Sequence, residues 1–178
     1  MTERYETKLI EDCIKTLIEK FKECPRYFFS ESDIKSYLYH LLISKESLKQ
    51  EYSTKSGYLI GVVHTEYPVI KGFFDLVALD TQSVNQLSIT KQKILCGIEI
   101  GLDQKYEHFM KDYSNFTPDA GNEVSLGYVL HFIKGYNADW AKVVEAVEEA
   151  ARTNDCSLIK KVETDEVKAL VVRIDLSK

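Results

Sequence analysis

Two stretches of this chain are apolar at almost every position: GFFDLVAL at 72–79 and the segment 93–100, which contains ILCGIEI. A strand with one face in water alternates apolar and polar residues, whereas these stretches carry apolar side chains on both faces. They are therefore predicted to be buried strands of a sheet that is covered on both sides. Each stretch nevertheless contains one carboxylate, Asp75 in the first and Glu99 in the second.

Helices and further strands are predicted around these two stretches. Apolar residues recur at helical spacing in 3–23, and Pro25 ends that helix. A capping box with Ser30 as N-cap opens a second helix. The remaining elements are expected to be a strand at 58–64, a helix from Asp103 to about 116, a strand at 126–133, a helix at 138–151 and a strand pair at 158–162 and 169–176, with polar segments at 44–57 and 81–92. This order predicts one α/β domain over 1–178, with a mixed sheet between helices.

The bulk composition argues against several classes of protein. No apolar run reaches the length of a membrane span, and the N-terminal MTERYETKLIEDC lacks the form of a signal peptide. The four cysteines are scattered without a CxxC pair, which is typical of reduced thiols in a cytoplasmic protein. The net charge of −5 disfavours a large nucleic-acid footprint. It does not exclude one, because a bound divalent metal would neutralise acidic side chains that the sequence counts as negative.

Three carboxylates interrupt the apolar pattern in an order that lets them converge. Asp75 and Glu99 lie in consecutive strands, which are usually neighbours in a sheet, and Glu31 lies at the start of a helix that can pack on that sheet. Carboxylates this close repel one another unless a cation binds them, and oxygen-only ligands favour Mg²⁺ or Mn²⁺. Such an ion supports phosphodiester hydrolysis. Alternatively, each strand acid is an edge residue or half of a structural ion pair, and Glu31 complements the helix dipole.

The succession of these motifs resembles the PD-(D/E)XK nuclease superfamily, which has the restriction-endonuclease-like fold. Glu31 on a helix is followed by a strand, GFFD, the strand IEI, the helix QKYEHFMKDYSNF and the strand LGYVLHFI. The resemblance covers the core at about 30–133 and implies an αβββαβ arrangement, with an extra N-terminal helix and a C-terminal helix plus β pair. It implies that Asp75, Glu99 and the backbone carbonyl of Ile100 bind Mg²⁺ or Mn²⁺, assisted by Glu31.

One residue departs from the family pattern. The pattern is Glu-x-Lys, with the lysine orienting or activating the attacking water, but the triplet at 99–101 ends in Gly101. Lys105 follows the strand by a short turn and is predicted to replace the family lysine. The predicted catalytic residues are therefore Asp75, Glu99 and Lys105. Lys35 and the uncharged Gln104 are alternatives, and each lysine is otherwise an ordinary solvated charge. Glycine at 101 also suits a sharp turn with positive φ.

These observations lead to three hypotheses for the function. The first is a metal-dependent nuclease that hydrolyses DNA, without membrane association and compatible with a homodimer. The second is a catalytically inactive domain of the same fold that binds nucleic acid or protein. The third is an interaction module with structural acids, because a fold does not determine a function. His64 and Glu66 share a strand face and either line the cleft or end the strand before Pro68; we favour the second interpretation.

Overall fold

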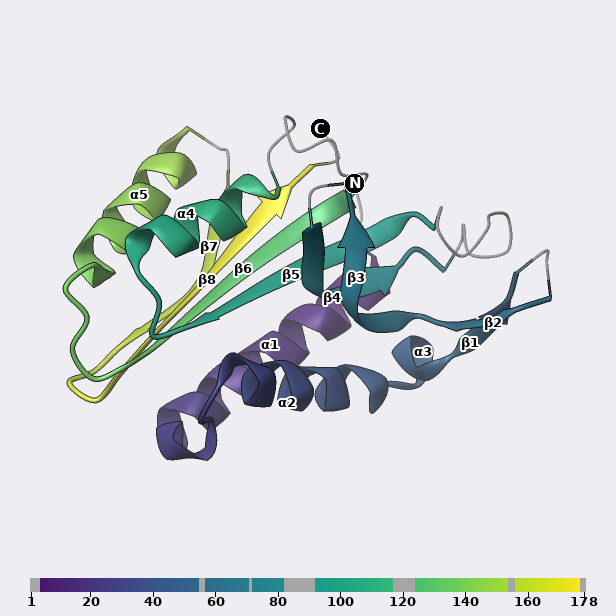
Figure 1. The fold of residues 1–178 in the computed structure, drawn as a ribbon, viewed down its shortest axis with the longest axis horizontal. Coiled ribbons are helices and arrows are strands. Elements are labelled where there is room, and N and C mark those ends of the chain that lie inside the picture. Colours follow the sequence, from purple (N-terminus) through teal and green to yellow (C-terminus); the bar gives the residue numbers. More distant parts are fainter. Residues whose placement is uncertain are drawn as a thin grey trace.

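The computed structural model describes residues 4–54, 57–70, 72–81, 92–116, 124–153 and 156–176. It is an α/β fold in which a mixed six-stranded sheet has helices on both faces (Figure 1). Within these ranges, no helix is both long and apolar enough to cross a membrane. The helices are α1 (Tyr5–Glu23), η1 (Pro25–Tyr27), α2 (Glu31–Ile43), α3 (Glu46–Lys49), α4 (Tyr106–Ser114) and α5 (Trp140–Arg152).

The large sheet has the strand order β3-β4-β5-β6-β8-β7. Neighbouring strands are antiparallel except β5 and β6, which run parallel and are joined through α4. A separate antiparallel pair, β1 and β2, extends from the main sheet (Figure 1). The strands are β1 (Glu51–Ser53), β2 (Leu59–Gly61), β3 (Val63–Val69), β4 (Gly72–Leu79), β5 (Ile94–Leu102), β6 (Val124–Lys134), β7 (Ser157–Glu163) and β8 (Val167–Asp175).

The predicted helices and strands occur in the predicted order, and most of the expected bounds are close to those observed, but the polar segment 44–57 also contains α3 and β1, which were not predicted. The strand at 72–79 was predicted residue for residue, and the capping box is present: the Ser30 hydroxyl accepts from the Asp33 backbone N–H while the Asp33 carboxylate accepts from the Ser30 N–H. Most of the polar segment at 81–92 lies outside the described residues.

Two expectations about element ends are wrong. The strand expected at 58–64 is divided between β2 and β3, and β3 continues through Pro68. Proline is tolerated there because β3 is an edge strand, where one side of the backbone has no ladder partner. Asp103 does not cap α4, whose N-cap is Lys105. Asp103 instead adopts φ +55° and accepts a hydrogen bond from the backbone N–H of Lys134 at 2.6 Å.

Apolar side chains cover both faces of the central strands, as their composition predicted. On one face, α1 and α2 pack against the sheet, and on the other face α4 and α5 do so (Figure 1). Glu99 of β5 is an exception to this apolar composition and is 5% exposed. Buried side chains of the first layer include Ile14, Leu17, Leu38, Ile98 and Leu130, and those of the second include Phe109, Val129, Trp140, Val143 and Val172.

A pair of glycines sets the position of the chain that follows α4. Gly97 of β5 lies opposite Gly127 of β6, and a methyl group on Gly127 would overlap the ring of Phe116. The missing side chains thus leave a hollow in the sheet that Phe116 fills, stacked on Phe74 with 4.9 Å between the ring centroids. This packing holds the preceding residue, Asn115, next to the buried carboxylate of β5.

Candidate functional site

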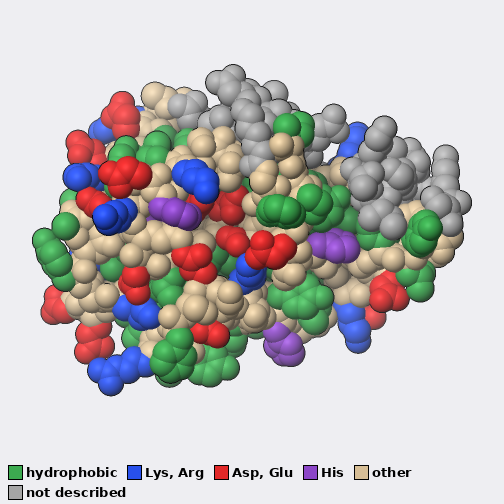
Figure 2. Space-filling model, in the orientation of Figure 1, with side chains coloured by type: hydrophobic (Ala, Val, Ile, Leu, Met, Phe, Trp, Pro, Cys, Tyr) green, Lys and Arg blue, Asp and Glu red, His purple; other side chains and the backbone are tan. Residues whose placement is uncertain are grey.

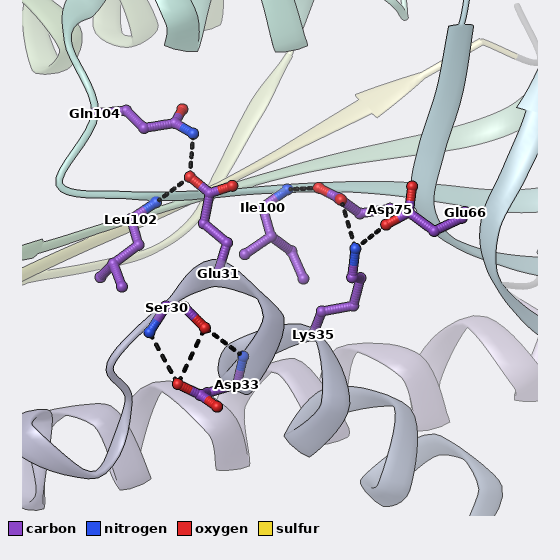
Figure 3. A network of polar contacts seen from close by, with 9 residues as sticks. All are labelled: Ser30, Glu31, Asp33, Lys35, Glu66, Asp75, Ile100, Leu102 and Gln104. Carbon is purple, nitrogen blue, oxygen red and sulfur yellow. Dashed lines mark hydrogen bonds and ion pairs between the residues drawn. The ribbon is translucent and has the colours of Figure 1, made fainter.

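The candidate site lies where β4 separates from its neighbour β5. The two strands are paired as far as Leu76 opposite Ile98. Asp75 precedes Leu76 in β4, and its carboxylate accepts a hydrogen bond from the backbone N–H of Ile100, with 2.8 Å between Oδ2 and N (Figure 3). A side chain of β4 therefore takes over from the backbone as the partner of β5, and no strand among the described residues pairs with the end of β5 on this side.

Glu31 occupies the next position along the same edge of β5. It is the first residue of α2, and its carboxylate accepts from the backbone N–H of Leu102 at 3.3 Å and from the side-chain amide of Gln104. Alternate N–H groups of a strand point to the same side, so Asp75 and Glu31 bind the N–H groups of residues 100 and 102 side by side. Figure 3 shows the two carboxylates on either side of Ile100.

Lys35 lies one helical turn after Glu31 and contacts two carboxylates. Its Nζ is 3.3 Å from Oδ1 of Asp75 and also binds the carboxylate of Glu66 on β3. The side chain is only 17% exposed. Burial acts to lower the pKa of Lys35, but the hydrogen bond to Glu66 and the negative charges of Asp75 and Glu66 outweigh it, so that the pKa lies above its usual value. The amine is therefore a cation at neutral pH.

Glu99 is buried beside Asp75 on the face of the sheet that α4 covers. Burial raises the pKa of Glu99 to about 8, and the negative charges of Asp75 and Asp112 act in the same direction. The side-chain amide of Asn115, which donates to Oε1 at 2.8 Å, only partly offsets this rise. Glu99 is accordingly protonated in most molecules at neutral pH, and a cation beside it would favour the loss of that proton.

Residues that the sequence did not single out surround Glu99. Asp112 of α4 is buried, which raises its pKa to about 6, and its carboxylate lies 3.2 Å from Nδ1 of His108. His108 and Asp112 are four residues apart and so share a helix face, which is a signal that was present in the sequence. Asn115 gave no such signal, because its approach to Glu99 depends on the packing of Phe116 described above.

Gly101 is explained by close packing and not by backbone conformation. Its φ lies outside the positive range, so the expected sharp turn is absent. A Cβ at this position would lie 2.8 Å from Oε1 of Gln104 and 3.1 Å from Nδ1 of His131. The amide that binds Glu31 thus occupies the space in which a lysine side chain at 101 would begin. His131 is buried, which lowers its pKa to about 4, so it is neutral at pH 7.

The two candidate lysines lie in different places. Lys35 reaches Asp75, as described above, whereas Lys105 is the exposed N-cap of α4. The positive charge of Lys105 acts on Asp139, whose pKa it helps to lower after the larger effect of the hydrogen bond from Lys142. Of the two amines, Lys35 is the one that the structure places against a predicted metal ligand.

Acidic side chains gather near the middle of the face shown in Figure 2, with a basic side chain next to them. Strands β4 and β5 are neighbours and Glu99 is turned away from bulk solvent, as the metal-site hypothesis requires. In the described parts of the chain, however, no three Asp, Glu, His or Cys side chains form a group that could hold one metal ion. Asp75 and Glu31 are hydrogen-bonded side by side to the backbone of β5, whereas Glu99 is hydrogen-bonded to Asn115.

Comparisons with known proteins add no relative from which a role could be transferred. No family model, no curated protein and no solved structure matches the chain.

The contact at Gly101 gives a first testable prediction. Gly101→Ala is expected to lower the free energy of unfolding by about 1 kcal/mol or more, because the methyl group displaces the Gln104 amide from Glu31. Gly101→Lys should be destabilised at least as much, because its side chain begins in the same space. Denaturant titration of the variants measures the change. In a Gln104→Ala background, Gly101→Ala should cost clearly less; equal costs in both backgrounds would contradict the explanation.

Proposed function

We propose that this chain is a metal-dependent nuclease that hydrolyses DNA phosphodiester bonds. The observation that carries the proposal is the position of Asp75 at the end of β5: one of its carboxylate oxygens accepts from the backbone N–H of Ile100, and the other contacts the ammonium of Lys35 from α2. The order of the helices and main-sheet strands supports it: α2 is followed by β3, β4, β5, α4 and β6, with α3 and the β1-β2 pair inserted after α2, and without that insertion this is the αβββαβ order that the family resemblance implies.

The donor set fits a hard divalent cation. Asp75, Glu99 and the carbonyl of Ile100 would hold Mg²⁺ or Mn²⁺, with Glu31 assisting, and all of these donors are oxygen atoms. The N–H and C=O of one strand residue point to the same side, so the carbonyl of Ile100 faces the side on which Asp75 binds its N–H. When bound, the metal would lower the pKa of a coordinated water and neutralise charge on the phosphoryl group.

The protein groups then have separate tasks during hydrolysis. A water oxygen adds to phosphorus, the bond from phosphorus to one ester oxygen breaks, and that oxygen leaves with a proton. Lys35 has a raised pKa and carries a positive charge, so it suits the stabilisation of negative charge on the phosphoryl oxygens and is a poor general base. Gln104 donates to Glu31 and fixes the orientation of that carboxylate.

One observation favours a second candidate function, a catalytically inactive nuclease-fold domain that binds nucleic acid or protein. Asp75 is contacted by Lys35 and by the backbone N–H of Ile100. Glu31 accepts hydrogen bonds from Leu102 and Gln104. Glu99 accepts a hydrogen bond from Asn115, and its raised pKa keeps it largely protonated and therefore uncharged. The three acids are thus satisfied by the protein itself, and no metal is needed to relieve their repulsion.

Metal binding and cleavage together distinguish these functions. Millimolar Mn²⁺ should raise the melting temperature of the wild type, because an ion that binds only the folded state at 100 times its Kd adds about 2.7 kcal/mol. Asp75→Asn keeps an oxygen for the Ile100 N–H and should abolish both this gain and plasmid cleavage. Asp12→Asn, an exposed acid of α1 paired with Lys15, is the control and should behave as wild type. A wild type with neither effect rejects the nuclease and leaves the binding domain.

A further inference from the structure

Glu66 is a fourth acid of the site, and nothing in the proposed function uses it. It lies in β3 between Thr65, which is opposite Leu76, and Tyr67, which is opposite Phe74, so it faces Asp75 across the two strands. Its φ is +50°, a conformation that non-glycine residues rarely adopt and that is destabilising within a strand. A costly conformation persists only where the surroundings hold it, and such residues gather at functional sites.

The carboxylate of Glu66 shares its partner with the predicted metal ligand. Lys35 Nζ contacts both Glu66 and Asp75, and Glu66 is the more exposed of the two acids, at 58% against 24%. A divalent cation on Asp75 would repel the ammonium of Lys35, so the two cations compete for one carboxylate. Glu66 is the carboxylate that Lys35 already contacts and that does not bind β5.

We propose that Glu66 is a positioning residue, which keeps the ammonium of Lys35 at the site while Asp75 binds the metal. This inference rests on the proposed function, because it requires a metal at Asp75. With Glu66 present, Lys35 leaves Asp75 without leaving the site. Without Glu66, Lys35 has Asp75 as its remaining partner there, and the metal must compete with an ammonium held on the same protein.

Titration calorimetry with MnCl₂ alone tests this in two backgrounds. Glu66→Gln should weaken Mn²⁺ binding by about fivefold or more, a coupling typical of charges that share one partner. Lys35→Met should strengthen binding, since it removes the competing cation. In the Lys35→Met background, Glu66→Gln should have little further effect. Glu66→Asp keeps the charge and should bind nearly as the wild type does, and Glu51→Gln, an exposed acid of β1, is the matched control.

The outcomes separate this inference from the proposed function. If the wild type does not bind Mn²⁺, the proposed function fails and the role of Glu66 fails with it. If the wild type binds Mn²⁺ but Glu66→Gln leaves the affinity unchanged, only the inference is overturned. A loss of the same size with and without Lys35 would also overturn it, because Glu66 would then act on the metal directly through its charge.

Discussion

Replacing Lys35 with methionine is expected to lower Mn²⁺-dependent DNA cleavage by about 10²- to 10³-fold, as the loss of one preorganised charge at a phosphoryl-transfer site does. Methionine keeps the length and apolar part of the side chain while removing the ammonium that contacts Asp75 at 3.3 Å. Affinity for Mn²⁺ should rise in the same variant. Tighter metal binding with slower cleavage is a combination that simple misfolding does not produce, and single-turnover rates at saturating Mn²⁺ measure it.

The same assay compares the three groups that could replace the missing family lysine. Lys105→Met should leave cleavage near the wild-type rate, because Lys105 is exposed and its charge acts on Asp139. Gln104→Ala should cause an intermediate loss through the disturbed position of Glu31. If Lys105→Met removes activity while Lys35→Met retains it, the replacement is the lysine that the sequence predicted, and the contact of Lys35 with Asp75 is structural.

The parts of the fold that the sequence predicted are those governed by local physical signals. An apolar composition on both faces identified β4 and β5, and the capping box at Ser30 identified the start of α2. The start of α4 was misplaced because Asp103 bonds the backbone of Lys134, which is 31 positions away in the sequence. The edge strand β3 was misplaced because pairing with β4, not composition, determines where it lies.

The sequence singled out the acids of the candidate site but not their partners. Asp75 and Glu99 stand out because a carboxylate in a buried strand breaks a strong pattern. Lys35 was only an alternative, since nothing in the sequence shows that α2 turns this residue towards β4. Asn115 could not be found at all, because its place beside Glu99 follows from the cross-strand glycine pair that accommodates Phe116.

The largest effect on stability is expected at Glu99. In the metal-free protein at pH 8.5, Glu99→Gln should unfold at a higher denaturant concentration than the wild type, with a gain on the order of a few kcal/mol. Such a gain is unusual for a substitution at a buried position. The amide keeps an oxygen that accepts from Asn115, so the hydrogen bond is retained while the ionisable group is removed.

The pH dependence of this gain follows from the direction of the shift. The pKa of Glu99 is about 8 in the folded protein and near its ordinary value of 4.5 when unfolded, so the folded state holds the extra proton between these values. The contribution of Glu99 to stability is therefore complete below about pH 4.5 and is lost as the pH rises through 8. Glutamine does not titrate, so Glu99→Gln has no such loss. The wild type and Glu99→Gln should therefore be about equally stable near pH 4.5, and their free energies of unfolding should diverge as the pH rises.

Addition of Mn²⁺ at pH 8.5 supplies the control for this prediction. The ion should stabilise the wild type, whose Glu99 can ionise and bind it, much more than Glu99→Gln, so the difference between the two proteins should shrink or reverse. Urea titrations of both proteins at pH 5 and pH 8.5, with and without Mn²⁺, measure the difference in stability between them under all four conditions. If the gain is the same at both pH values, Glu99 is not protonated in the folded state. If Mn²⁺ stabilises both proteins equally, Glu99 is not a ligand, and the metal site would have to be sought at Asp75 and Glu31 alone.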